Sequence, residues 1–307
     1  MSVLPEKDLP PGRHRLLKEH LMTEIRQETQ AAESRPRRSP WLRPVLIGAA
    51  AAAVAAGVLV ALPAGGKGTT ADAAPNDAAA LLEDIALAAA KEDAPDEIRD
   101  DQYVYIKSVV GYTSQELGKK AKLDPVHDRE IWFAVDGTRP GLLVEDNRNG
   151  RIELEADTPG IPSNTNYKNL KTLPTDPDAM LKWLYKNKQG DNQKDEQVFT
   201  FVGDLVRESL VPPAQAAALY RAVAKVPDVE VVKDVKDAAG RTGIAVVRDE
   251  GPTAQRQLIF DPKTKQYLGE RVVTTEDHAE TGLKKGDVQG TAALLDREVV
   301  DKREQRP

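Results

Sequence analysis

The sequence predicts an α+β fold. An extracytoplasmic domain, with an antiparallel β-sheet and covering helices, follows one transmembrane helix and a short cytoplasmic amphipathic helix. An uncharged apolar run, a series of short alternating segments between turn residues, and a helical middle predict it. We divide the chain into a cytoplasmic arm at 1–44, a transmembrane helix at 45–62, a stalk at 63–76 and an extracytoplasmic α+β domain at 77–307.

The cytoplasmic arm carries one amphipathic helix. Leu17, Leu21 and Ile25 recur four residues apart, so they share a helix face. A single helix of this length cannot form a core, so it docks on a partner, lies on the lipid surface or stays weakly ordered. Its charges are mixed rather than strongly basic. We therefore expect Leu17, Leu21 and Ile25 to contact a cytoplasmic protein partner.

The run at 45–62 has no polar side chain. As a helix it extends roughly 27 Å, just long enough for a hydrocarbon core about 30 Å thick. Arginines cluster before it, at 35–43, and few basic residues follow it. The positive-inside rule then predicts one membrane span, with the N-terminus in the cytoplasm and the large C-terminal part outside.

Two alternatives to an uncleaved anchor stay open. A signal peptide would need a cleavage site, and Ala71-Asp72-Ala73 has the small-x-small pattern. Its charged leading segment is normally much shorter than residues 1–44. The other alternative is a buried helix of a soluble protein. The small residues Gly48, Ala52 and Ala56 share a helix face and permit a homodimer through the membrane helix, although an Ala-rich run produces this spacing by chance.

The domain at 77–307 begins with a helix capped by Asn76 or Asp77. Alternating apolar residues then predict strands, and a helix begins after Asp176 with Pro177 at its first position. The expected strands cover 101–112, 129–137, 141–146, 151–156, 229–235, 243–250, 256–261, 267–275 and 291–301, and the expected middle helices cover 176–190, 196–210 and 212–227. Residues 237–240 and 261–264 have the composition of hairpin turns.

The sequence offers no chemistry that identifies an enzyme. There is no cysteine, which excludes thiolate nucleophiles and zinc sites that need sulfur. Nucleophile-elbow, P-loop, dinucleotide and zinc-protease motifs are missing. We therefore expect no catalytic residues, no metal and no cofactor. The net charge of −6 comes from an acidic C-terminal part, which argues against nucleic-acid binding.

Aromatic residues offer one candidate binding surface. Tyr103, Tyr105, Trp132 and Phe133 lie in two predicted strands. Side by side they would line a hydrophobic groove for a ligand. The alternative is that most of them pack in the core.

Several segments together resemble a family. They are "DLPPGRHRLLKEHLMTEI", the Ala-rich span, "LYRAVAKVPDVEVVKDVKDAAGRTGIAV" and "IFDPKTKQYLGE". The chain resembles uncharacterised single-pass membrane proteins of actinobacteria, often encoded near extracytoplasmic-function sigma factors and sometimes labelled anti-sigma-like. The resemblance implies organisation and a regulatory setting, and no catalytic residues. One departure is Lys265, where the family usually has Gly, so the turn is expected to differ.

Three functions follow. The first is a membrane signalling accessory that regulates a sigma factor or senses the envelope. The second is an exported ligand- or lipid-binding module, which a continuous apolar cavity behind the four aromatics would favour and a tightly filled sheet face would disfavour. The third, an exported hydrolase, lacks convergent polar groups in the sequence.

Overall fold

The computed structural model describes residues 75–92, 97–116, 119–146, 150–188 and 193–307. They belong to one compact unit, Ala64–Pro307. None of the helices within these ranges is both long and apolar enough to cross a membrane. The transmembrane helix predicted at 45–62 and the arm with Leu17, Leu21 and Ile25 lie outside the described residues, so both stay predictions.

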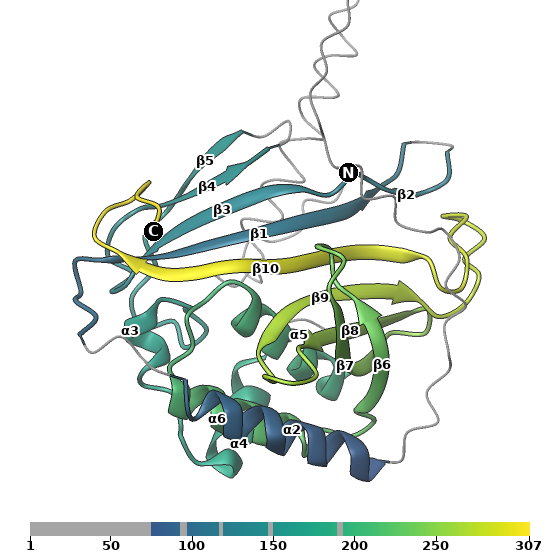
Figure 1. Ribbon diagram of the computed structural model, residues 1–307, viewed down its shortest axis with the longest axis horizontal. Helices are drawn as coiled ribbons and strands as arrows, with labels where there is room; N and C mark the ends of the chain where they lie inside the picture. Colours follow the sequence, from purple (N-terminus) through teal and green to yellow (C-terminus); the bar gives the residue numbers. More distant parts are fainter. Residues whose placement is uncertain (1–74, 93–96, 117–118, 147–149, 189–192) are drawn as a thin grey trace, which may run out of the picture. The chain divides into compact units, whose positions relative to one another are not determined.

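A large antiparallel sheet forms the framework of the unit, in the order β5-β4-β3-β1-β10-β9-β8-β7-β6, with β2 paired to β1 (Figure 1). Every described strand pair is antiparallel, as predicted. The strands are β1 (Tyr103–Ser114), β2 (Lys122–Leu123), β3 (His127–Ala134), β4 (Gly141–Glu145), β5 (Arg151–Leu154), β6 (Glu230–Lys236), β7 (Thr242–Glu250), β8 (Ala254–Phe260), β9 (Tyr267–Thr274) and β10 (Val288–Val300).

The helices gather on one side of this sheet, and the strands from β9 to β6 curve around α5 (Figure 1). They are α2 (Pro75–Ala89), α3 (Tyr167–Leu170), α4 (Pro177–Asn187), α5 (Lys194–Arg207) and α6 (Pro213–Val223). Apolar faces of α2, α4, α5 and α6 pack with Val231, Val246, Leu258 and Phe260 in the main core. The predicted covering helices are therefore confirmed.

Local signals set the helix boundaries. Asp176 caps α4 by accepting a hydrogen bond from the Ala179 N–H at 2.9 Å, and Pro177 occupies the first turn, as predicted. The prediction for the first helix is wrong by two or three residues, because α2 begins at Pro75 rather than after Asn76 or Asp77. The periodicity of the apolar face predicts that a helix forms but does not fix the residue at which it begins.

Both predicted C-terminal hairpins form. Asp237 accepts hydrogen bonds from the N–H groups of Ala239 and Arg241 in the turn between β6 and β7. Asp261 does the same for Lys263 and Thr264 between β8 and β9. These side chains satisfy turn amides that no ladder partner reaches.

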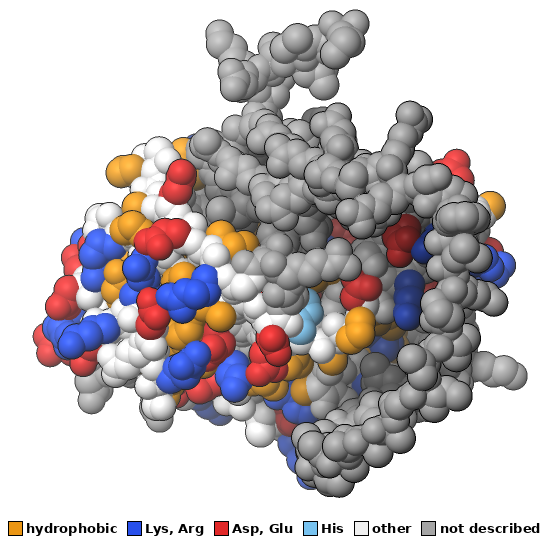
Figure 2. Space-filling view, turned by 90° about the horizontal axis from the view of Figure 1, so that it is seen from above, with side chains coloured by type: hydrophobic (Ala, Val, Ile, Leu, Met, Phe, Trp, Pro, Cys, Tyr) orange, Lys and Arg blue, Asp and Glu red, His pale blue; other side chains and the backbone are white. Residues whose placement is uncertain are grey.

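The opposite face of β1 and β3 carries its own cluster, which contains Tyr103, Tyr105, Trp132, Ala134, Leu142 and Val300. The C-terminal segment covers it: the Trp132 indole N–H donates to the carbonyl of Gln305 at 2.6 Å, and the Arg306 guanidinium lies 5.8 Å from the Trp132 ring centre. Around this region basic and acidic side chains lie next to one another on the surface (Figure 2).

Candidate functional site: a cleft along β10

A cleft of about 1100 Å³ lies between the helices and the C-terminal half of β10. We call it the β10 cleft and define it by its walls. They are the end of α2 with the residues after it, the connection between α5 and α6, the hairpin between β8 and β9, and Leu294–Val299 of β10. A space of this size matches small-molecule and peptide sites in other proteins.

The cleft exists because β9 and β10 separate. β9 pairs with β10 from Val288 to Ala293, whereas β1 pairs with β10 as far as Val300. The register between β1 and β10 shifts between Lys107 and Ser108, which leaves Leu295 without a partner in β1. An extra residue of this kind is a β-bulge, which bends a strand and increases its twist.

Arg241 occupies the point where the two strands diverge. Its Nη2 donates to the carbonyls of Leu268 in β9 and Leu294 in β10, both at 2.8 Å. The fully buried carboxylate of Asp237 holds this guanidinium at 2.7 Å. One side chain from a hairpin turn therefore satisfies carbonyls that a continuing ladder would have paired.

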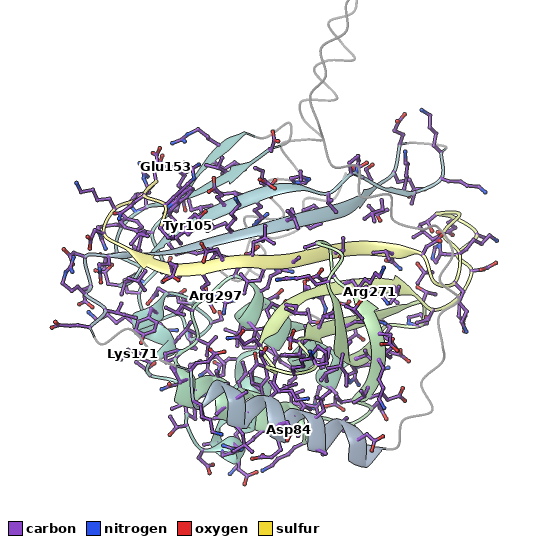
Figure 3. All side chains as sticks on the ribbon, in the orientation of Figure 1. Asp84, Tyr105, Glu153, Lys171, Arg271 and Arg297 are labelled. Carbon is purple, nitrogen blue, oxygen red and sulfur yellow. The ribbon has the colours of Figure 1, made fainter. Side chains whose placement is uncertain are left out.

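Polar groups converge on the floor of the cleft. Arg297 donates from Nη2 to the Val206 carbonyl at the end of α5 at 2.5 Å, while its Nε has no hydrogen-bond partner. Figure 3 shows Arg297 between β10 and the helical layer. The Tyr267 hydroxyl is buried and also lacks a partner. Tyr267 and Tyr220 pack edge-on against Phe260 from two sides, at centroid distances of 5.7 and 5.6 Å.

The electrostatics of this floor are unbalanced. Burial lowers the pKa of the Arg297 guanidinium, and the raising effects of Tyr220, Tyr267 and Glu92 do not offset it. Burial also raises the pKa of Glu92, against the smaller opposing effect of Arg297. A desolvated cation without a bonded carboxylate is costly, so an arriving anion would find a favourable position here.

Apolar side chains line the rim. Leu87 on α2 is 44% exposed and Leu295 on β10 is 43% exposed, and both line the cleft. Each offers apolar surface to an occupant of the cleft. The cleft therefore combines the Arg297 guanidinium, acidic and basic side chains, and two exposed leucines.

An ion-pair network beside the cleft fixes α5 on the sheet. Arg129 bonds Glu145 and Glu208, and Arg207 and Arg256 both bond Glu270. These arginines have raised pKa values because their carboxylate partners outweigh the effect of burial. The network holds the end of α5, and with it the Val206 carbonyl that Arg297 contacts.

The four aromatics predicted as a groove do not form one surface. Tyr105 pairs with Trp132 across β1 and β3, with ring centres 5.2 Å apart, and Tyr103 lies on the same face. Phe133 pairs with Val104 and therefore points to the other face. The Tyr105 hydroxyl donates to Glu130 at 2.6 Å, and the Arg306 guanidinium lowers the pKa of that glutamate. This is a filled sheet face, the arrangement that counts against a groove there.

The sequence prediction missed the residues of the β10 cleft. Their one local signal is the adjacent pair Leu294-Leu295, which interrupts the alternation in "TAALLDREVVD" and marks the bulge. Nothing local indicates that Arg297 faces a cleft, because that depends on where β9 leaves β10.

No protein-family model matches the sequence, and no curated protein matches it either. Among solved structures, the chain is similar to one in "The complex structure of Pseudomonas aeruginosa MucA/MucB", with 13% identity and a TM-score of 0.28. The match covers 73% of this chain and 57% of that one. The sequence identity and the TM-score are both low, so this likeness says nothing about function.

Proposed function

We propose that the protein is a single-pass membrane signalling accessory. In this proposal residues 45–62 anchor it, the arm at 1–44 lies in the cytoplasm, and the extracytoplasmic domain at 77–307 binds a ligand in the β10 cleft. The domain itself is a binding domain rather than an enzyme. The proposal assigns sigma-factor regulation or envelope sensing as the output.

The observation that carries the binding role is the β10 cleft. It places a partly buried guanidinium, Arg297, with an unpartnered Nε at the floor of a space of about 1100 Å³. Exposed Leu87 and Leu295 stand at its rim. A concave site where polar groups and apolar side chains meet is the usual candidate for a binding site.

The sequence supports the signalling role. The apolar stripe of Leu17, Leu21 and Ile25 has no core of its own to bury it. A short helix of this kind fits a hydrophobic groove of a cytoplasmic partner such as a sigma factor. The alternative is an exported binding module whose arm plays no part, and the same cleft supports it equally.

Partner capture separates the two functions. The full chain, tagged at the N-terminus, is cross-linked in cells and recovered with its contacts. Leu17→Glu/Leu21→Glu is the matched control, because it removes the apolar stripe and leaves the anchor intact. A sigma factor recovered with the parent and lost with the control supports signalling.

The other outcomes are equally informative. Envelope proteins alone, recovered equally with parent and control, support the exported binding module. A tagged fragment that lacks the extracytoplasmic domain, with that domain released outside, means that the chain is cleaved and refutes the uncleaved anchor.

A further inference from the structure

β10 has a free edge where it borders the cleft. On one side β1 pairs with it up to Val300, and on the other side β9 pairs with it only up to Ala293. Among the described residues, no strand pairs with β10 on that second side beyond Ala293. The edge from Leu294 to Val299 therefore presents backbone groups that a ladder has not used.

The cleft runs along this edge rather than over one face of the strand. Side chains of successive strand residues point to opposite faces. All the residues from Leu294 to Val299 nevertheless line the cleft. A space that follows the edge contacts both faces in succession, which accounts for this lining. At about 3.3 Å per residue this edge is roughly 20 Å long, enough for an extended segment of about six residues.

One hydrogen bond gives the direction of the free groups. The N–H of Arg297 donates to Oδ1 of Asp296 at 2.8 Å, so it points out of the β1 ladder. In a strand the N–H of Val299, two residues on, points the same way. The Asp296 carboxylate thus covers one edge donor in the free protein. A charged side chain at an edge is a common protection against unwanted pairing.

Charges of both signs line the cleft, including Asp296 and Glu298 on the edge itself, and Arg297 between them favours an acidic occupant. Arg129, Arg207 and Arg256 each bond a carboxylate. Arg297 has no ion pair among the described residues, and its side chain lies in the same cleft as the free edge. Its Nε is buried and unpartnered, so the charge of the guanidinium would attract a carboxylate placed beside it in the cleft. Leu87 and Leu295 offer apolar contacts to neighbouring side chains.

We propose that an extended segment of a partner protein adds as a strand to the edge of β10 between Leu295 and Val299. An Asp or Glu of that segment pairs with Arg297, and its apolar side chains contact Leu87 and Leu295. This inference rests on the proposed function, in which the β10 cleft is the binding site. Strand addition of this kind derives its affinity from main-chain hydrogen bonds and its specificity from alternate side chains.

The test uses the full chain in lipid nanodiscs and a random peptide library displayed on phage. Peptides are selected on the parent and their affinity is then measured on Val299→Pro, which removes an outward N–H without touching the β1 ladder. The matched control is Val299→Thr, which keeps the N–H and the branched side chain. Thermal unfolding of both variants confirms that they are folded.

We expect peptides rich in Asp or Glu that bind the parent and Val299→Thr alike. Their affinity should fall about tenfold or more on Val299→Pro, a loss of about one main-chain hydrogen bond plus a ring clash. Arg297→Gln should weaken the acidic peptides and leave their amide versions unaffected. Hydrogen exchange on the parent should show the Arg297 and Val299 amides protected by a bound peptide.

Two results would overturn the inference. One is a selection that enriches no peptide, or only peptides that bind Val299→Pro equally well and leave both amides unprotected. The other is binding of vesicles that contain an anionic phospholipid, if Arg297→Gln weakens that binding and Val299→Pro leaves it unchanged. That second result would keep the cleft as the binding site and so leave the proposed function standing. If Val299→Pro unfolds, the amide protection alone decides.

Discussion

Replacing Glu270 by Gln should destabilise the domain strongly, because this carboxylate lies between two arginines. Its side chain is 7% exposed and accepts hydrogen bonds from Arg207 and Arg256. The substitution keeps the shape and removes the charge, so two buried guanidinium groups lose their shared anion. Breaking a buried ion pair in this way costs about 3–5 kcal/mol. For a domain of this size the melting temperature should fall by about 6–20 °C.

The assay is thermal unfolding of the full chain in detergent, followed by circular dichroism. Glu298→Gln is the matched control, because this exposed glutamate lies on the neighbouring strand β10. We expect it to change the stability by less than about 0.5 kcal/mol. A melting temperature for Glu270→Gln equal to that of Glu298→Gln would refute the role of the network.

The pH dependence gives the same prediction a second readout. Burial alone would raise the pKa of Glu270, but Arg207 and Arg256 outweigh it and hold the pKa below its ordinary value. A carboxyl with a lowered pKa in the folded state stabilises the protein above its ordinary pKa and loses that effect as the pH falls through the folded value. The difference between the parent and Glu270→Gln should thus be largest at neutral pH and shrink below pH of about 4.

Three further substitutions test the hairpin and the point where β9 leaves β10. Lys265 adopts a φ of 64°, a left-handed conformation that costs a residue with a Cβ some strain. Lys265→Gly should therefore stabilise the domain by about 0.5–1 kcal/mol in thermal unfolding. An unchanged stability would mean that Lys265 is not strained. Gly269→Ala places a Cβ 2.1 Å from the Ala292 carbonyl oxygen, and urea unfolding should show a loss of about 3 kcal/mol. Arg241→Met removes the partner of the buried Asp237. It should cost about 1–2 kcal/mol, and Asp237→Asn added to it should restore part of that in a double-mutant cycle.

Strands, turns and covering helices are predictable from the sequence because local patterns decide them. The alternation over 101–112 and 243–250 corresponds to β1 and β7, and Asp176-Pro177 places the start of α4. The same alternation already separates Trp132 from Phe133, which are neighbours in a strand and so cannot face one groove. The groove prediction grouped the four residues as aromatics and overlooked that successive residues of a strand face opposite sides of the sheet.

The cleft was beyond prediction because its parts are distant in sequence. β10 joins β1 across most of the domain, and nothing local indicates this pairing. The Lys265 position shows the opposite case. The resemblance expects Gly there, and the structure gives Lys265 the left-handed backbone that Gly adopts without strain.

The position of α2 suggests how an occupied cleft would affect the rest of the chain. Its C-terminal half forms one wall of the β10 cleft, and in sequence it directly follows the predicted stalk and anchor. An exposed ion pair, Arg221 to Glu83 at 2.7 Å, adds to its apolar packing on α6, and such pairs contribute little. A ligand can shift an equilibrium only by its differential affinity for two states. In our proposal a partner strand contacts Leu87 on α2 and pairs with β10, so it binds both walls at once, and a displacement of α2 would change its affinity.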